Sequence, residues 1–310
     1  MIKHNTNYGE SQSPKTYGER ARKLFSKLQI KKGYNLDVIE FLKAEREYIR
    51  ADRIESCGTY LELVREGDIP KILRANFCRE RLCHVCAWRK QSKFVAQVSP
   101  VLEELSAQGF EYIFVTLTLR NSSADDLRGA LDQFMKAYNK FLGRKQIAQS
   151  FAGVIRSLEI TYNDKEDTFH PHVHCLVAVD DDYFKNPGKY LSQKDICNIW
   201  KECAQVDYTP VCYVEKVTEN QRAELETLKY CVKPSKHRQA IEVFYRVLKG
   251  RRLVSFSGVF AQYRKRIESE VERLTDNISP GKYTAVCYKF DPTGGVYKYY
   301  KTYEGVSDEQ

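Results

Sequence analysis

The chain has 310 residues and a formal net charge of +9, and its 42% hydrophobic and 29% charged residues are the ordinary balance of a soluble globular protein. This length suffices for one large domain or two smaller ones. The polar first twelve residues lack an apolar secretory segment and no run reaches the length of a membrane span, so we expect a cytoplasmic protein with no membrane partner. The basic charge, with 21 tyrosines and 15 phenylalanines, favours nucleic acid, because aromatic rings stack on unpaired bases.

The N-terminal third is predicted to be helical or irregular. Residues 1–35 are polar and basic and predict a flexible or loosely helical arm, while residues 36–54 repeat apolar side chains at helical spacing. A cysteine-rich basic segment follows over residues 55–90, and a helix over residues 91–107 ends before Gly109.

Four cysteines of this segment form a candidate metal site. Cys83 and Cys86 have the x2 spacing of a chelating knuckle, Cys78 precedes Cys83 at x4 spacing, and Cys57 lies further upstream. Because a chain without an export signal is expected in a reducing compartment, clustered cysteines favour a metal over disulfides, and four thiolates suit tetrahedral zinc. His84 could compete as a ligand, and buried free thiols are the alternative interpretation.

Basic residues surround these cysteines. Arg79, Arg81 and Arg89 lie within a few residues of the knuckle. A zinc-pinned loop that carries arginines suits contacts with phosphate groups of DNA, and a solvated basic surface is the alternative.

A run of β-branched and aromatic residues over 112–119 predicts a strand and begins a region in which strands and helices follow one another. The other expected elements, in chain order, are a helix to about Leu142, strands over 154–162 and 171–179, a helix over 192–203, a strand over 208–217, helices over 218–232 and 239–249, and a hairpin of 283–290 with 296–303. Helices interspersed with antiparallel strands predict an α+β fold.

A pair of histidines in the third predicted strand is a candidate metal site. His172 and His174 are two residues apart, so their side chains project from one face of the strand. If Tyr162 pairs with Pro171 across the loop, Glu159 lies opposite His174 on the same face. Two imidazoles and a carboxylate suit Mg²⁺ or Mn²⁺ beside a phosphate oxygen, with zinc as a further option.

Two alternatives to this metal site are bland. The histidines would then lie on the solvated face of an edge strand, and Glu159 would be an exposed carboxylate. His170, at the end of the loop, is expected beside the ligands or facing the substrate.

A tyrosine on the helix predicted over 218–232 is the candidate nucleophile. Glu226 and Tyr230 are four residues apart and share a helix face. A phenol is a workable nucleophile toward phosphorus when its charge is stabilised, and Glu226 could take a proton from an attacking group. From spacing alone, a half-buried helix tyrosine is the stronger interpretation.

Three motifs then occur in a recognisable order: Phe114–Leu119, which ends a strand in Thr-Leu-Thr; His170–Val177, with the histidine pair; and Lys229–Lys233, with Glu226 ahead of it. With the cysteine segment and the run 250–258, they make the chain resemble the rolling-circle replication initiators of small bacterial plasmids, members of the HUH endonuclease superfamily. The similarity covers residues 55–260. It implies a central antiparallel sheet flanked by helices, with a small cysteine-rich segment that resembles a zinc-binding one.

The resemblance also implies metal-dependent nicking and joining of origin DNA. Tyr230 would form a 5′-phosphotyrosine link and release a 3′-OH primer, and in the one-tyrosine branch a glutamate at the place of Glu226 activates water for the terminating cleavage. The remaining implied site residues are the metal ligands His172, His174 and Glu159, the residues beside them, His170, Thr116 and Thr118, and the phosphate-neutralising Lys229 and Lys233.

Segments and partners complete the interpretation. We expect a basic arm and helix over 1–50, a zinc-binding-like segment over 51–95, a nuclease core over 105–260, and a C-terminal extension with a hairpin over 261–310. Expected partners are plasmid origin DNA, single-stranded or as an extruded hairpin, the host helicase and polymerase, and a second copy of the chain. The alternatives are an HUH transposase of a mobile element and a non-catalytic zinc-dependent DNA-binding regulator.

Overall fold

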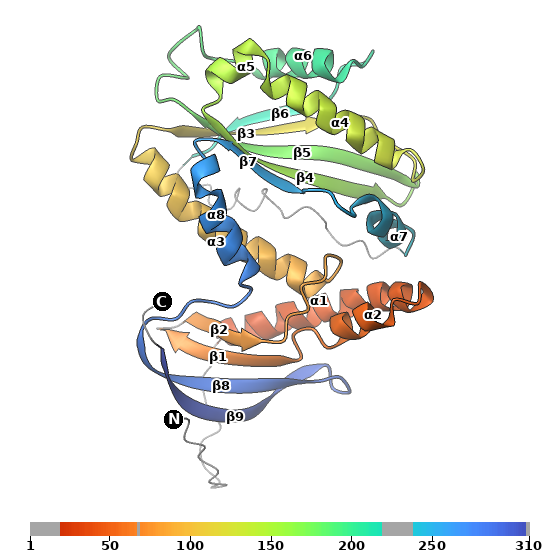
Figure 1. Ribbon diagram of the computed structural model, residues 1–310, viewed down its shortest axis with the longest axis vertical. Helices are drawn as coiled ribbons and strands as arrows, with labels where there is room; N and C mark the ends of the chain where they lie inside the picture. Colours follow the sequence, from red (N-terminus) through yellow and green to blue (C-terminus); the bar gives the residue numbers. More distant parts are fainter. Residues whose placement is uncertain (1–18, 67–68, 219–237, 308–310) are drawn as a thin grey trace. The chain divides into compact units, whose positions relative to one another are not determined.

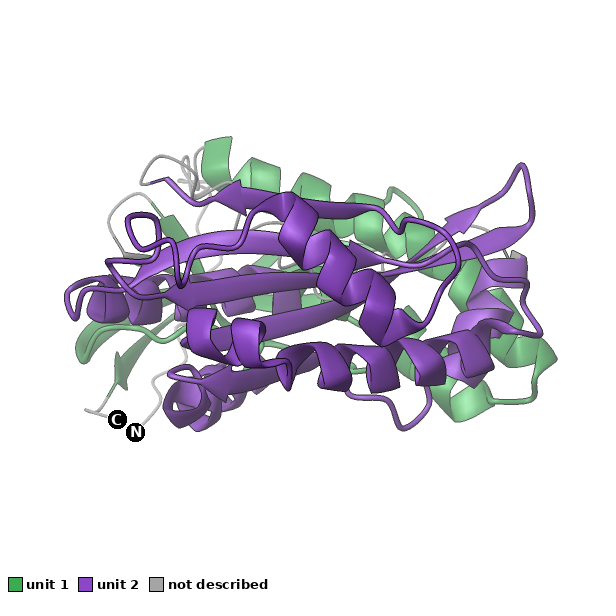
Figure 2. Ribbon diagram, turned by 90° about the horizontal axis from the view of Figure 1, so that it is seen from above, with its two compact units in different colours: residues 1–89, 273–310 green, residues 90–272 purple. Residues whose placement is uncertain are grey.

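The computed structural model describes residues 19–66, 69–218 and 238–307. The chain forms two compact units, shown in different colours in Figure 2. Unit 1 comprises Met1–Arg89 and Arg273–Gln310, and unit 2 comprises Lys90–Glu272. Both are built from helices and antiparallel strands, which confirms the predicted α+β class. Among the helices described, none has the length and apolar character needed to cross a membrane.

Unit 1 is a four-stranded antiparallel sheet with helices packed on it. Its strand order is β2-β1-β8-β9, and its elements are α1 (Glu19–Ala44), α2 (Tyr48–Glu55), β1 (Tyr60–Glu66), β2 (Ile69–Ala75), β8 (Gly281–Asp291) and β9 (Val296–Ser307). The ring of Phe25 on α1 stacks on Tyr297 and packs against Tyr288, which places α1 on one face of the sheet. The helix predicted to begin at residue 36 therefore begins far earlier, and it stops where Arg46 adopts a left-handed φ of 61°.

The two ends of the chain meet in this sheet. The predicted C-terminal hairpin is confirmed as β8 and β9, with Asp291 paired to Val296 at its turn. β8 also pairs with β1, as in Leu61 opposite Tyr288 (Figure 1). The β1–β2 hairpin itself was not predicted, because the cysteines that flank it dominate that part of the sequence.

Unit 2 is a five-stranded antiparallel sheet with the order β6-β3-β5-β4-β7. Its strands are β3 (Glu111–Thr118), β4 (Gly153–Asn163), β5 (Thr168–Val179), β6 (Cys212–Lys216) and β7 (Val254–Gly258). The strands predicted at 112–119, 154–162, 171–179 and 208–217 are confirmed with small shifts of their ends. β5, which carries the histidine pair, is the central strand and is hydrogen-bonded on both sides.

Helices cover both faces of the second sheet (Figure 1). On one face α4 and α6 meet where Phe134 packs against Trp200, whose indole N–H donates to the Thr118 carbonyl oxygen at 2.9 Å. On the other face Phe94 of α3 contacts Phe256 of β7. The bounds of these helices and of the remaining ones are α3 (His84–Ser106), α4 (Leu127–Leu142), α5 (Lys145–Ser150), α6 (Gln193–Ala204), α7 (Arg238–Val247), η2 (Ala261–Tyr263) and α8 (Arg264–Glu272).

The register of β4 on β5 differs from the predicted one by two residues. Tyr162 pairs with Phe169 rather than with Pro171, so Glu159 lies opposite His172 and Ser157 lies opposite His174. Because side chains alternate with a period of two, a shift of two residues keeps Glu159 on the histidine face. The predicted juxtaposition therefore survives, although the predicted partner of Glu159 was wrong.

Candidate active site and cysteine cluster

Three side chains of the second sheet converge on one point. The Nε2 atoms of His172 and His174 each lie 2.9 Å from the same oxygen, Oε2 of Glu159. The three side chains are largely buried, with exposed fractions of 12% for His172, 14% for His174 and 6% for Glu159. β5 contributes both histidines and β4 contributes the carboxylate, so the cluster is held by the hydrogen-bond ladder between the two strands.

The second nitrogen of each histidine is engaged by the surrounding protein. His172 Nδ1 lies 3.2 Å from the His170 carbonyl oxygen, and His174 Nδ1 lies 3.1 Å from Oγ1 of Thr116 on β3. A carbonyl oxygen only accepts, so His172 carries its proton on Nδ1 when neutral and presents an Nε2 lone pair toward Glu159. This arrangement, with the outer nitrogen hydrogen-bonded and the inner one directed at a carboxylate, is typical of metal-binding histidines.

The carboxylate at the centre of the cluster is ionised. Burial raises the pKa of Glu159, but hydrogen bonds with His172 and His174 outweigh burial, and the net shift is below the ordinary value. One negative charge therefore faces two imidazoles. Oxygen and nitrogen donors of this kind could hold a divalent cation and leave positions for further ligands.

The residues expected beside the ligands have different partners. Thr116 contacts His174, whereas Thr118 donates its hydroxyl hydrogen to the Val211 carbonyl oxygen at 2.8 Å and ties β3 to the segment before β6. His170 packs its ring 5.3 Å from that of His172. Its Nδ1 lies 2.8 Å from Oδ1 of Asn121, and burial lowers its pKa. Asn121 is a neighbour that no spacing in the sequence indicated.

The predicted nucleophile cannot be placed beside these groups. Tyr230, Glu226, Lys229 and Lys233 all lie outside the described residues, as does most of the helix predicted over 218–232.

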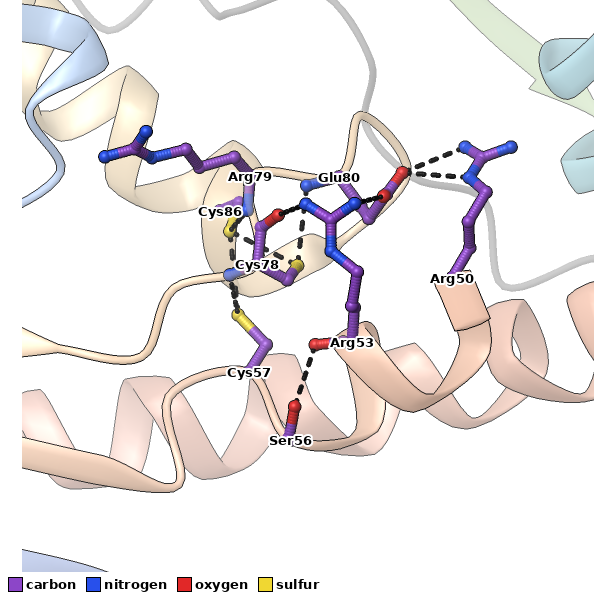
Figure 3. A network of polar contacts seen from close by, with 8 residues as sticks. All are labelled: Arg50, Arg53, Ser56, Cys57, Cys78, Arg79, Glu80 and Cys86. Atoms are coloured by element: carbon purple, nitrogen blue, oxygen red, sulfur yellow. Dashed lines mark hydrogen bonds and ion pairs between the residues drawn. The ribbon is translucent and has the colours of Figure 1, made fainter. Parts of the chain in front are cut away.

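The four cysteines of unit 1 are brought together in space. Their sulfur atoms all lie within 4.8 Å of one another, and Cys86 Sγ is 3.6 Å from both Cys57 Sγ and Cys78 Sγ. These distances exclude disulfides, which require about 2.05 Å between sulfurs. Figure 3 shows how the segments carry them: Cys57 follows α2 and Cys78 follows β2, while Cys86 lies in the first turn of α3. Cys83 immediately precedes α3.

Backbone groups around the sulfurs favour thiolates. The backbone N–H of Arg79 donates to Cys86 Sγ at 3.2 Å and that of Glu80 donates to Cys78 Sγ at 3.4 Å. Arg79 reaches this position with a left-handed φ of 60°. Hydrogen bonds from the other three thiols lower the pKa of the Cys83 thiol well below its usual range. The positive end of the α3 dipole acts in the same direction.

His84 is not a member of the cluster, although its position in the sequence made it a candidate ligand. Its backbone N–H donates to Oδ1 of Asn35 at 2.7 Å, and its ring packs 5.4 Å from that of Tyr34. Asn35 also donates from Nδ2 to Cys83 Sγ at 3.4 Å, so this buried α1 amide orients the N-terminus of α3. Asn35 was missed from the sequence, because a single asparagine in a helix carries no signal of such a role.

The three arginines near the cluster divide into two kinds. Arg79 and Arg81 are exposed, and Figure 3 shows the Arg79 guanidinium directed away from the sulfurs. Arg89 is 8% exposed, donates to the Leu274 carbonyl oxygen and forms an ion pair with Asp276. Its guanidinium is therefore committed to holding α3 to the segment before β8 rather than facing solvent.

Comparison with known proteins identifies the chain. Residues 70–286, more than two thirds of its length, match the model of a family described as replication protein. This chain belongs to the replication-protein family. Over 234 residues the replication protein is 32% identical to Protein rep of Streptococcus pneumoniae serotype 2, which covers 71% of this chain and 73% of that relative. Over 209 residues it is 34% identical to Protein rep of Staphylococcus aureus, covering 66% and 91%.

The family match confirms the resemblance to plasmid replication initiators. It includes both sheets in part and the His172–His174 pair, and replication by such a protein implies binding to plasmid origin DNA. No solved structure matches the replication protein.

Proposed function

We propose that this replication protein starts rolling-circle replication by nicking one strand of the plasmid origin and later rejoining it. The observation that carries the proposal is the convergence of His172 and His174 on a single oxygen of Glu159. Two imidazoles and one carboxylate at the centre of a sheet form half of a coordination sphere, which suits a reaction at a phosphate group.

His172, His174 and Glu159 would hold the catalytic cation, Mn²⁺ or Mg²⁺. The cation, when bound, withdraws electron density from a phosphate oxygen and so makes phosphorus easier to attack. The protein's own contribution is orientation: Thr116 and the His170 carbonyl hold the outer nitrogens of the two ligands, and their inner nitrogens stay directed toward Glu159.

Tyr230 is the proposed nucleophile. Its phenolic oxygen forms a bond to phosphorus while the bond from phosphorus to the 3′ oxygen breaks, so the protein keeps the 5′ phosphate and the DNA keeps a 3′-OH. The phenol gives up its proton in this step, and the departing 3′ oxygen takes one. Glu226 would later take a proton from the water that attacks in the terminating cleavage, and Lys229 and Lys233 would balance phosphate charge.

The cysteine cluster has a separate role in the proposal. Cys57, Cys78, Cys83 and Cys86 would hold a structural zinc ion, because their four sulfurs are buried, mutually close and supplied with backbone N–H donors. The released 3′-OH is the substrate of a polymerase, so the host helicase and polymerase are the expected partners. A homodimer is the proposed assembly.

A cleavage assay tests the nicking proposal directly. The wild-type protein is incubated with labelled single-stranded origin DNA and Mn²⁺ or Mg²⁺, beside Tyr230→Phe and the control Tyr213→Phe, which alters an exposed tyrosine of β6. We expect a metal-dependent covalent protein–DNA adduct from the wild type and the control, and none from Tyr230→Phe.

Two results would contradict the proposal. An equal adduct from Tyr230→Phe would assign the nucleophile to another residue. Binding of origin DNA without cleavage, in the presence of either cation, would favour the non-catalytic regulator.

A further inference from the structure

One face of the unit 1 sheet is not used by the proposed reaction. α1 packs on the opposite face, where Phe25 contacts Tyr288 and Tyr297. The remaining face gathers tyrosines and lysines from β1, β8 and β9. We call it the tyrosine–lysine face, and it comprises Tyr60, Lys289, Lys298, Tyr300, Lys301 and Tyr303.

The strand register places these residues together. Tyr60 of β1 lies directly opposite Lys289 of β8, which in turn lies directly opposite Lys298 of β9. Directly opposed residues in antiparallel strands project from the same face, so this row crosses three strands. The next row on that face ends with Lys301, which lies opposite Cys287.

A β-bulge adds an aromatic ring to this face. Tyr288 pairs with Tyr299 and Cys287 pairs with Lys301, so Tyr300 is the extra residue of β9. A bulge redirects the side chain of its extra residue. The Tyr300 ring is 50% exposed and has the Lys289 ammonium nitrogen 3.6 Å from its centroid, which places it on the tyrosine–lysine face.

The other two tyrosines are held in place by a buried acid. The hydroxyls of Tyr60 and Tyr303 donate to the two carboxylate oxygens of Glu62, at 2.6 and 2.7 Å. Burial, reinforced by Glu62, raises the pKa of both phenols, so they stay protonated donors. The Glu62 charge is thereby satisfied from within the sheet, and the two rings are fixed before any ligand arrives.

We propose that the tyrosine–lysine face binds single-stranded DNA. Exposed aromatic rings beside cations are the chemistry that recognises unpaired nucleotides, because bases stack on the rings and ammonium groups pair with phosphates. Lys301 lies 5.9 Å from the centroids of both Tyr300 and Tyr303, within reach of the phosphate of a nucleotide stacked on either ring.

The charges on this face favour a polyanion. Lys298 is paired with Asp291, but within the described part of the chain no carboxylate lies at ion-pair distance from Lys289 or Lys301. The sequence as a whole carries a net charge of +9. A duplex hides the faces of its bases, so stacking selects an unpaired strand. This binding does not depend on the nicking chemistry proposed above, because it uses none of its residues.

Fluorescence anisotropy with a labelled oligothymidylate of about 15 nucleotides tests the proposal. The full chain is used without added Mn²⁺ or Mg²⁺ and without chelator, so that neither nicking nor the cysteine cluster affects the result. Tyr300→Ala is compared with Tyr300→Phe and with Tyr299→Ala. Tyr299 is a matched control, since it is 51% exposed and adjacent, but its hydroxyl bonds to Thr302 on the opposite face.

We expect Tyr300→Ala to weaken binding about 5-fold or more, with Tyr300→Phe and Tyr299→Ala close to the wild type. Replacing Lys289 and Lys301 together by glutamine should lower the slope of log K against log salt by about 1.4. Unchanged binding by Tyr300→Ala would overturn the proposal, as would equal losses from Tyr299→Ala or Tyr300→Phe.

Two further results decide the remaining cases. If Tyr300→Ala shifts the thermal melting curve, the double lysine variant decides alone, and an unchanged salt slope refutes the proposal. If the wild type binds duplex and single strands equally and Tyr300→Ala weakens both alike, stacking on unpaired bases is refuted.

Discussion

Removal of one cysteine from the cluster should release a zinc ion and unfold part of unit 1. In a regular tetrahedron the distance between ligands is about 1.63 times that from ligand to metal, so sulfurs 3.6 Å apart correspond to a metal–sulfur distance of about 2.2 Å. This value is close to the ~2.3 Å of zinc–thiolate bonds. The four sulfurs are thus already spaced as ligands of one zinc ion.

The energetic effect should be large. Structural zinc contributes about 10–16 kcal/mol of apparent binding free energy at neutral pH, whereas the folding of a whole domain is favourable by only about 5–15 kcal/mol. Cys86→Ser removes the sulfur that contacts both Cys57 and Cys78. We therefore expect this variant to lose the zinc and to lose the cooperative unfolding of unit 1.

Metal analysis, X-ray absorption and limited proteolysis check this prediction. The wild-type protein should contain about one zinc ion per chain, bound by four sulfurs at ~2.3 Å. Cys86→Ser should contain none and be cleaved early between α1 and the start of α3. Cys287→Ala is the matched control, because Cys287 is fully buried in the same unit but lies outside the cluster. Full zinc content in Cys86→Ser, or an unchanged melting curve after zinc is stripped from the wild type, would refute the reasoning.

Glu159→Gln should weaken Mn²⁺ binding about 10-fold or more in a calorimetric titration, because it removes the only negative charge among the three donors, whereas Glu166→Gln in the exposed turn of the same hairpin should bind normally. The pKa of Glu159 is lowered in the folded protein, so its ionisation stabilises the fold above the ordinary glutamate pKa and this contribution is lost as pH falls through the lowered value; a difference in unfolding free energy between wild type and Glu159→Gln that grows on acidification would contradict this sign. Arg89→Met should cost about 3 kcal/mol of unfolding free energy in urea, because it leaves Asp276 without its partner, and it should leave the salt dependence of DNA binding unchanged. Arg81→Met, an exposed change beside the cluster, should shift stability by less than ~0.5 kcal/mol, and a reduced salt slope in Arg89→Met would instead assign this arginine to DNA.

Local patterns were sufficient for the candidate sites. The alternation of side chains along a strand places His172 and His174 on one face wherever that strand lies, and the short spacing of Cys83 and Cys86 brings two sulfurs to one end of a helix. The hairpin around Asp291 was equally predictable, because its turn residues lie between two runs with strand composition.

Register was only partly predictable. The pairing of β4 with β5 depends on how many residues the intervening turn uses, and the predicted turn was too long. The error was two residues, so Glu159 stayed on the face of the histidines; an error of one would have moved it to the other face.

The sequence by itself therefore determined which residues could bind metal and on which face of their own strand or helix they lie, because those properties arise from the geometry of neighbouring residues in the chain. The tertiary structure alone decided that β1 pairs with β8, that Arg89 is buried against Asp276, and that a bulge directs Tyr300 to the same face as Lys289. Each of these contacts joins segments whose association depends on the packing of a whole sheet, and no local periodicity encodes that free energy.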